Sequence, residues 1–319
     1  MIVPEYLKEK DIIGTTACSC GVLEKIEKYE RSTKNIKSMG FDILETPNVR
    51  TRGIVSSDKV TRAKELESLY LNNNVKAIAI SSGGDFLIDM LDQVNYDAIR
   101  NNVKWLCGSS DPTSLLFTVT TNLDIATIYT PCNMSGFSSD NLHKSYLDYF
   151  EILKGNLVKQ NRYPFYESED DIFDKENKWI NINGNVDETG ILIGGCIESL
   201  KDVIGTEFDR TREFLEKYKD NIWYFDVFSL SAEDLYRTLL QFKNAGWFKY
   251  TKAIIIGKVR FPGSFMNLSY EEMIKKALPD MKVIYNFDVG HVKPSFTMIN
   301  GFKVRVISND NEGSLEYLK

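Results

Sequence analysis

The strongest constraint on the fold is the alternation of apolar strands with helices in the first half of the chain. The segments "IIGTTAC" (12–18), "VKAIAI" (75–80) and "KWLCG" (104–108) are rich in apolar residues, as are strands buried on both faces of a parallel sheet. Stretches with helical periodicity separate them. The pattern predicts an α/β fold with an N-terminal Rossmann-like parallel-sheet domain, in which ligands collect at the carboxyl ends of the strands.

The second half of the chain is organised differently. Residues 140–190 are polar, aromatic and acidic. The run "ESEDDIFDKENKW" (167–179) is expected to be a solvated loop rather than a metal site, because no histidine accompanies its carboxylates. Further strands and helices then predict a smaller, β-rich α/β domain. We therefore expect an N-terminal domain over 1–140, a connecting segment over 141–185 and a C-terminal domain over 186–319.

The composition excludes several classes of partner and site. With 43% hydrophobic and 26% charged residues, the chain has the composition of a soluble globular protein, and no segment is apolar for long enough to span a bilayer. A net charge of −6 gives no reason to expect nucleic acid or an anionic membrane as partner. The first residues lack the order of a signal peptide, so we expect a cytoplasmic protein. No zinc-type spacing links the cysteines, which predicts free thiols; they are Cys18, Cys20, Cys107, Cys132 and Cys196. We also expect neither a metal nor a cofactor.

The turn after the third apolar strand offers a nucleophile. In "GSSDPT" (108–113), Gly108 allows a sharp turn, Ser110 could present its hydroxyl, and the backbone N–H of Asp111 could stabilise an oxyanion at the start of a helix. The motif is not the GxSxG of α/β-hydrolases, because Pro112 stands where the second glycine should be. On local sequence alone, a helix cap formed by Ser110 or Asp111 is the favoured interpretation.

A base, an acid and a second oxyanion donor can be found elsewhere. Of the two histidines, His143 begins a polar helix, whereas His291 follows an apolar strand and a glycine in "DVGHVKPSF" (288–296) and is the better base. Asp226 interrupts the apolar strand "NIWYFDVF", where a buried carboxylate needs a partner such as His291 or ends the strand as a cap. Backbone amides at Gly84 or Asp85, in "SSGGDF" after a strand, could complete an oxyanion hole, although an ordinary turn would have the same sequence.

Five stretches spread over the chain resemble the LD-carboxypeptidase and microcin-immunity (MccF-like) serine peptidases of family S66. The resemblance implies a Ser-Glu-His triad in which Ser110 is the nucleophile, Asp226 occupies the position of the acid and His291 is the base. It also implies a metal-free cytoplasmic hydrolase, often a homodimer, that cleaves murein LD-peptides or peptidyl-nucleotide amides. The stretches are "IGTTACSCGV", residues 62–116, "ILIGGCIESL", "AGWFKYTKAIIIGK" and "DVGHVKPSFTMINGFKVRV".

Two departures from the family pattern leave alternatives open. Asp226 replaces the family glutamate, and Asp85 stands where a tyrosine is common, so a catalytically impaired protein that binds a peptide or nucleotide is the alternative to a serine carboxypeptidase. A cysteine hydrolase using Cys107 is a weaker alternative, because this residue belongs to the strand rather than the turn. Lys258 and Arg260 could recognise a carboxylate, but cations at a strand end are usually solvated.

Overall fold

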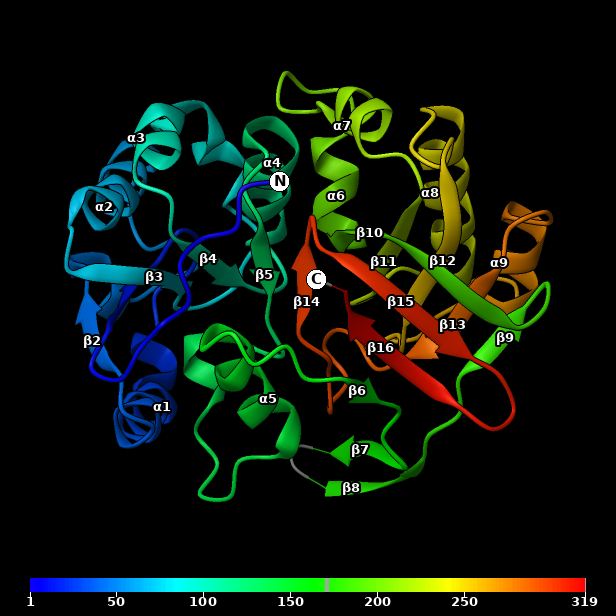
Figure 1. Cartoon of the computed structure of the whole chain (residues 1–319), viewed down its shortest axis with the longest axis horizontal. Helices are drawn as coiled ribbons and strands as arrows, with labels where there is room; N and C mark the ends of the chain where they lie inside the picture. The colour runs from blue at the N-terminus through cyan, green and yellow to red at the C-terminus, as the bar shows by residue number, and fades with distance from the viewer. Residues whose placement is uncertain (170–171, 319) are drawn as a thin grey trace. The chain divides into compact units, whose positions relative to one another are not determined.

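The computed structural model describes residues 1–169 and 172–318. They form two compact units, Met1–Asn156 and Leu157–Lys319 (Figure 1). The second unit begins within the segment 141–185 that the sequence predicts as a connection. That segment is structured, because it contains the whole of helix α5 and strands β6 to β9.

The first unit is built on parallel strands. Within it the strands pair in the order β5-β4-β3-β1-β2, and every one of these pairs is parallel. Strand β1 lies between β2 and β3, so the order reverses there, as in doubly wound folds. Strands β3 and β4 are almost wholly buried, as their apolar sequences predict. The strands are β1 (Ile12–Thr16), β2 (Asp42–Glu45), β3 (Val75–Ile80), β4 (Trp105–Gly108) and β5 (Thr127–Tyr129).

Helices and short 3-10 segments connect these strands. Asp58 begins α2 by accepting hydrogen bonds from the backbone N–H groups of Val60 and Thr61. The helices are α1 (Ile26–Ser38), α2 (Lys59–Leu71), α3 (Tyr96–Asn101), α4 (Thr113–Leu123) and α5 (Lys144–Leu153). The 3-10 segments are η1 (Leu23–Lys25), η2 (Pro47–Arg50), η3 (Ile88–Gln93) and η4 (Met134–Gly136).

The second unit has a mixed sheet with the strand order β6-β16-β15-β10-β11-β12-β13-β9. The central strands β10 to β13 are parallel, and antiparallel pairs flank them on both sides. The predicted fold class, a parallel-sheet domain followed by a β-rich α/β domain, is confirmed. The strands of this sheet are β6 (Gln160–Asn161), β9 (Ile180–Ile182), β10 (Val186–Cys196), β11 (Asn221–Asp226), β12 (Thr251–Gly257), β13 (Val283–Phe287), β15 (Lys303–Ser308) and β16 (Gly313–Tyr317). Strand β14 (Met298–Asn300) is a further strand of this unit and is not part of this sheet.

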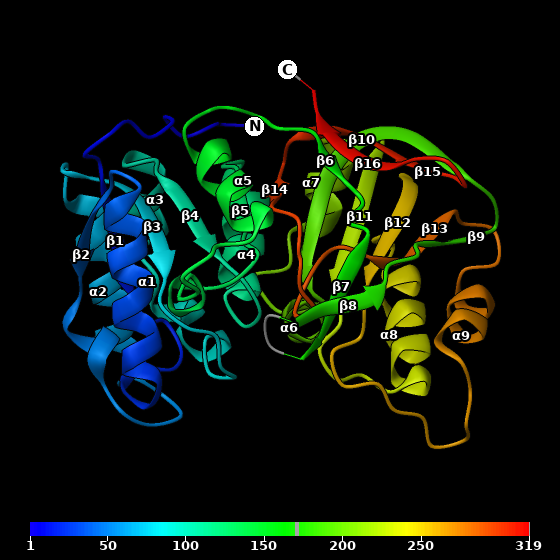
Figure 2. The same cartoon turned by 90° about the horizontal axis from the view of Figure 1, so that it is seen from below.

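The helices of this unit begin at side-chain caps where their sequences allow it. Ser231 caps α8, and Ser269 forms a capping box with Glu272 at the start of α9. Helices α8 and α9 pack side by side (Figure 2). The helices are α6 (Ile197–Val203), α7 (Thr211–Lys217), α8 (Ala232–Asn244) and α9 (Tyr270–Ala277).

The acidic run 167–179 is not the solvated loop predicted for it. It contributes to a hairpin of β7 (Phe165–Glu169) and β8 (Ile172–Glu176), while residues 170 and 171 of the run lie outside the described residues. Most side chains of both strands are exposed, so no apolar face marks the strands in the sequence. Glu167 is the exception, because it is buried and accepts a hydrogen bond from the backbone N–H of Lys293.

Residues 1–169 and 172–318 contain neither a membrane-spanning helix nor a cluster of metal ligands. No helix there has both the length and the apolar character needed to cross a membrane. Nowhere in the same residues do three or more His, Cys, Asp or Glu side chains gather in a way that could hold a metal ion.

Candidate active site

The turn between β4 and α4 holds Ser110 in a strained backbone conformation. Its φ of +67° lies in the left-handed region, which a residue with a Cβ atom adopts at a cost of about 1–2 kcal/mol. Gly108 makes the turn possible, because a Cβ atom there would lie 2.8 Å from Cβ of Pro112. Strained residues at strand-to-helix turns often have a functional role, and here the strained residue is the predicted nucleophile.

The favoured alternative, a helix cap at this turn, is wrong. Pro112 occupies the cap position of α4, and no side chain caps the helix. The carboxylate of Asp111 instead accepts hydrogen bonds from the backbone N–H groups of Phe86, at 3.1 Å, and Leu87, at 3.0 Å. Burial raises the pKa of Asp111. Local sequence cannot separate the two readings, because the acceptor serves a segment 25 residues away.

Two residues that sequence reasoning missed hold the backbone at this turn. The side chain of Asn133 accepts a hydrogen bond from the N–H of Ser109 and donates one to its carbonyl, each at 2.9 Å. The hydroxyl of Tyr129, at the end of β5, accepts from the N–H of Ser110 at 3.0 Å. These bonds hold the backbone of Ser109 and Ser110, and so help to keep Ser110 in its left-handed conformation.

The glycine turn after β3 lies against Ser110. A Cβ atom built on Gly83 would be 3.4 Å from Oγ of Ser110, so glycine allows this close approach. Gly84, one of the predicted oxyanion donors, has a φ of +153° and packs against Ser19 and Cys20. In the described parts of the chain, no acceptor is found for the backbone N–H groups of Asp111, Gly84 and Asp85. These groups are therefore free to bind an oxyanion.

In the second unit, the predicted acid and base contact each other. Asp226 ends β11 and is fully buried, and its Oδ2 lies 2.7 Å from Nδ1 of His291. Its Oδ1 accepts a hydrogen bond from the backbone N–H of His291 at 3.1 Å. The shorter side chain of aspartate therefore reaches the histidine without the extra methylene of a glutamate.

Gly290 makes this contact sterically possible. Its φ is +108°, and a Cβ atom built on it would lie only 1.9 Å from Oδ1 of Asp226. Any other residue would therefore displace the carboxylate, the loop or both. The glycine that marked His291 in the sequence is thus a requirement of the Asp226–His291 contact.

The environment of His291 favours a charged ring. Burial lowers the pKa of His291, but the Asp226 carboxylate outweighs this effect, and the net result is a pKa raised above the ordinary value. The ring of Phe228 packs on the imidazole, with centroids 4.6 Å apart. No partner for Nε2 of His291 is found among residues 1–169 and 172–318, so this nitrogen is available to accept a proton.

Glu198 was missed by sequence reasoning and holds the loop after β11. Its Oε1 accepts hydrogen bonds from the N–H groups of Phe228, Ser229 and Leu230, at 3.0, 2.8 and 3.2 Å. This carboxylate lies at the start of α6, just after the glycines in "ILIGGCIESL". It therefore sets the position of the aromatic ring that covers His291.

The two cations considered for carboxylate recognition are not simply solvated. Lys258 is buried, and its Nζ lies 2.7 Å from Oδ1 of Asp288 and 2.9 Å from the carbonyl oxygen of Asn286. Arg260 pairs with the buried carboxylate of Glu167 at 3.1 Å. Both side chains are therefore engaged within the protein.

The remaining candidate groups have structural explanations. Cys107 is buried in β4, and burial raises its pKa to about 12, which leaves a protonated and unreactive thiol. Nδ1 of His143 accepts a hydrogen bond from the N–H of Ser145 and so caps α5. Neither residue takes part in the Asp226–His291 contact.

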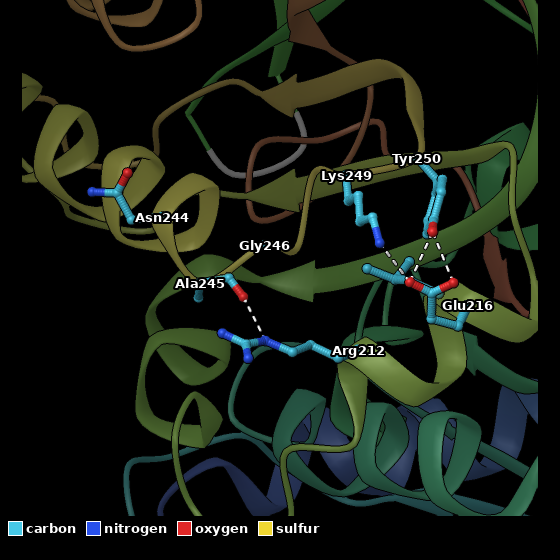
Figure 3. Close-up of a pocket in the computed structure, with 8 residues that line it drawn as sticks. Arg212, Glu216, Asn244, Ala245, Gly246, Lys249 and Tyr250 are labelled. Carbon is cyan, nitrogen blue, oxygen red and sulfur yellow. Dashed lines mark hydrogen bonds and ion pairs between the residues drawn. The ribbon is translucent and has the colours of Figure 1, made fainter.

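A pocket of about 260 Å³ in the second unit lies at the amino ends of β11 and β12, whereas Asp226 lies at the carboxyl end of β11. Its charged groups bond to protein groups (Figure 3). The carboxylate of Glu216 accepts hydrogen bonds from Lys249 and Tyr250, both at 2.7 Å, and Nε of Arg212 donates to the carbonyl of Ala245. The pocket thus lies at the opposite end of the strands from the Asp226–His291 contact.

Comparisons with known proteins agree with these observations. Two family models match, the LD-carboxypeptidase N-terminal domain over residues 13–130 and the LD-carboxypeptidase C-terminal domain over residues 189–306. A Treponema pallidum protein assigned as a carboxypeptidase is 25% identical, over 94% of this chain and 90% of its own.

Solved structures with the same fold include a microcin-immunity protein and a muramoyltetrapeptide carboxypeptidase. The microcin C7 self-immunity protein MccF in complex with aspartyl sulfamoyl adenosine has a TM-score of 0.87 at 21% identity, and the alignment covers 100% of this chain and 99% of that one. Muramoyltetrapeptide carboxypeptidase from Oxalobacter formigenes has a TM-score of 0.76 at 18% identity, over 97% and 99% of the two chains. Because the two family models together match more than half of the chain, the protein belongs to the S66 family of LD-carboxypeptidases, which are serine peptidases.

Proposed function

We propose that the protein is a metal-independent serine carboxypeptidase in which Ser110 is the nucleophile, His291 the general base and Asp226 the residue that orients the base. The observation that carries the proposal is the engagement of both oxygens of the buried Asp226 carboxylate by His291. A carboxylate in this position fixes the imidazole tautomer and stabilises the imidazolium that forms during the reaction.

The reaction follows from these roles. Nε2 of His291 accepts the proton of the Ser110 hydroxyl while Oγ bonds to the carbonyl carbon of the amide. The N–H of Asp111 and an N–H of the Gly84–Asp85 turn bind the resulting oxyanion. When the C–N bond breaks, the imidazolium returns the proton to the departing amine. Water, deprotonated by His291, then hydrolyses the acyl-enzyme and releases Ser110.

The substrate that we propose is an amide next to a terminal carboxylate, as in murein LD-peptides, or a peptidyl-nucleotide amide. Two proteins of the same fold support these classes, since one is a muramoyltetrapeptide carboxypeptidase and the other is MccF bound to aspartyl sulfamoyl adenosine. We also propose that the protein acts in the cytoplasm as a homodimer without a metal or cofactor. Light scattering of the purified protein would measure its mass in solution.

The Ser110→Ala variant tests the nucleophile. Hydrolysis of LD-peptides or peptidyl-nucleotide amides should fall on the order of 10⁴-fold or more. A fluorophosphonate should label the wild type but not the variant. Ser68→Ala, which removes an exposed hydroxyl from α2, is the matched control and should keep both activity and labelling. A folded wild-type protein that binds these substrates but is neither labelled nor active would favour the binding-protein alternative.

A further inference from the structure

A carboxypeptidase has to recognise the anionic end of its substrate, and Lys25 is placed to do this. Lys25 ends η1, just before α1, and its Nζ donates a hydrogen bond to Oγ of Ser82 at 2.7 Å. Ser82 directly precedes Gly83, the residue that lies against Ser110. The ammonium group is therefore beside the glycine turn that adjoins the proposed nucleophile.

We propose that Lys25 binds the anionic group of the substrate that lies one residue beyond the scissile carbonyl. The inference rests on the proposed function, because it assumes that Ser110 attacks that carbonyl. In a peptide the anion is the terminal carboxylate, and in a peptidyl-nucleotide amide it is the phosphoryl group. Lys25 thereby selects substrates whose cleaved amide has a negative charge nearby.

The ammonium of Lys25 has donors to spare. A lysine can donate three hydrogen bonds, and in the described residues the one partner of Nζ is the neutral hydroxyl of Ser82. Lys258 differs, because Asp288 and a backbone carbonyl already neutralise and occupy it. A substrate carboxylate would give Lys25 the charged partner that the protein does not supply.

The surroundings of Lys25 favour a bound anion. Desolvation by neighbouring atoms lowers its pKa, although the side chain remains exposed enough for a ligand to reach it. A partly desolvated ammonium without a counter-charge is unfavourable, and an anion that binds there recovers part of that free energy.

The spacing also fits the substrate. Ser82, which holds Lys25, and Gly83, which adjoins Ser110, are consecutive residues, so their Cα atoms are about 3.8 Å apart. In an LD-peptide the terminal carboxylate belongs to the residue directly after the scissile carbonyl. Neighbouring residues of one turn therefore contact Lys25 and Ser110, which would bind two groups that are neighbours in the substrate.

The test compares an LD-peptide with a free carboxylate, the same peptide ending in a carboxamide, and a peptidyl-nucleotide amide. For the wild type, kcat/KM should be about 10- to 100-fold higher for the acid than for the carboxamide, the range expected for one charge-assisted hydrogen bond. Lys25→Gln should abolish this preference by raising KM for the acid, with kcat/KM for the carboxamide unchanged. If Lys25→Gln also lowers kcat/KM for the peptidyl-nucleotide amide, the phosphoryl group binds at the same site.

Two controls separate a specific contact from a general charge effect. Lys25→Arg should keep most of the preference for the acid. Lys28→Gln removes an exposed charge from α1, three residues away, and should leave the preference intact. If the ratio of kcat/KM for the acid to kcat/KM for the carboxamide is the same in Lys25→Gln as in the wild type, the proposal is wrong.

A further measurement distinguishes failure of this proposal from failure of the proposed function. Labelling of Ser110 by a fluorophosphonate should occur at the same rate in wild type and Lys25→Gln. An unlabelled wild type contradicts the proposed function, whereas a labelled protein with an unchanged acid preference contradicts only the role of Lys25. Calorimetric binding of the uncleaved acid to Ser110→Ala, with and without Lys25→Gln, decides the role of Lys25 even if no hydrolysis occurs.

Discussion

The turn that holds Ser110 and the loop that holds His291 are built on opposite principles. At the serine turn, a residue with a side chain takes the left-handed conformation, and the neutral side chains of Asn133 and Tyr129 hold the turn by accepting hydrogen bonds from the N–H groups of Ser109 and Ser110. At the histidine loop, Gly290 takes the positive φ and the buried charge of Asp226 holds the ring. The protein thus places its proposed nucleophile by backbone strain and its proposed base by electrostatics.

Replacing Asp226 by asparagine removes the charge of the acid but keeps its shape, and it should abolish most of the hydrolytic activity. In Asp226→Asn, kcat/KM should fall about 10⁴-fold, as in serine proteases that lose the charge of the acid. The base acts in its neutral form, so activity rises with pH through the pKa of His291. That raised pKa should put the acid limb of the wild type above pH of about 6.5.

The Asp226→Asn variant should also differ from the wild type in the pH dependence of kcat/KM. Asp226→Asn removes the carboxylate that raises the pKa of His291 and leaves the burial that lowers it, so the acid limb should move to lower pH. The pH profile of kcat/KM measures this shift. An acid limb at the same pH in both proteins would mean that Asp226 does not control the base.

Adding a methyl group at Gly290 should disturb the same contact through sterics. Gly290→Ala combines a positive φ with a clash against Oδ1 of Asp226, and the free energy of unfolding should fall by about 3 kcal/mol or more. Gly205→Ala is the matched control, because its φ is +77° and the space around it is open. It should cost only about 1 kcal/mol. Equal losses in chemical denaturation would refute the steric argument.

Relieving the strain at Ser110 should have the smallest effect, with the opposite sign. Ser110→Gly removes the Cβ atom from a left-handed residue, so the free energy of unfolding should rise by about 1 kcal/mol while hydrolysis is lost. Ser110→Ala keeps the Cβ atom and should unfold within about 0.5 kcal/mol of the wild type. Denaturant titration compares the three proteins, and a Ser110→Gly protein less stable than the wild type would argue against strain.

The fold could be predicted because its signals are local. Strands β3 and β4 are continuous apolar runs, and their burial follows directly from their sequences. The hairpin of β7 and β8 could not be predicted in this way, since its strands are mostly exposed and carry no apolar face. The backbone pairing of two neighbouring segments, rather than an apolar pattern, makes this part of the chain a hairpin.

The candidate site could be predicted only in part. Ser110, Asp226 and His291 stand at strand ends or beside glycines, so the sequence alone identifies them as candidates. Their catalytic roles remain predictions. Asn133 and Glu198 were missed, because a hydrogen bond to the backbone depends on which distant segment lies nearby. For the same reason the local sequence favours a helix cap by Ser110 or Asp111, whereas the Asp111 carboxylate accepts hydrogen bonds from Phe86 and Leu87.

The Asp111 carboxylate also determines how this region can be engineered. Because it bonds to the backbone just after the glycine turn, the loops that follow β3 and β4 form one mechanical part. A loop graft, insertion or deletion in residues 81–87 will therefore move Ser110 unless residues 108–113 are exchanged with it. Redesign of this peptidase for new substrates should transfer both loops as a single module.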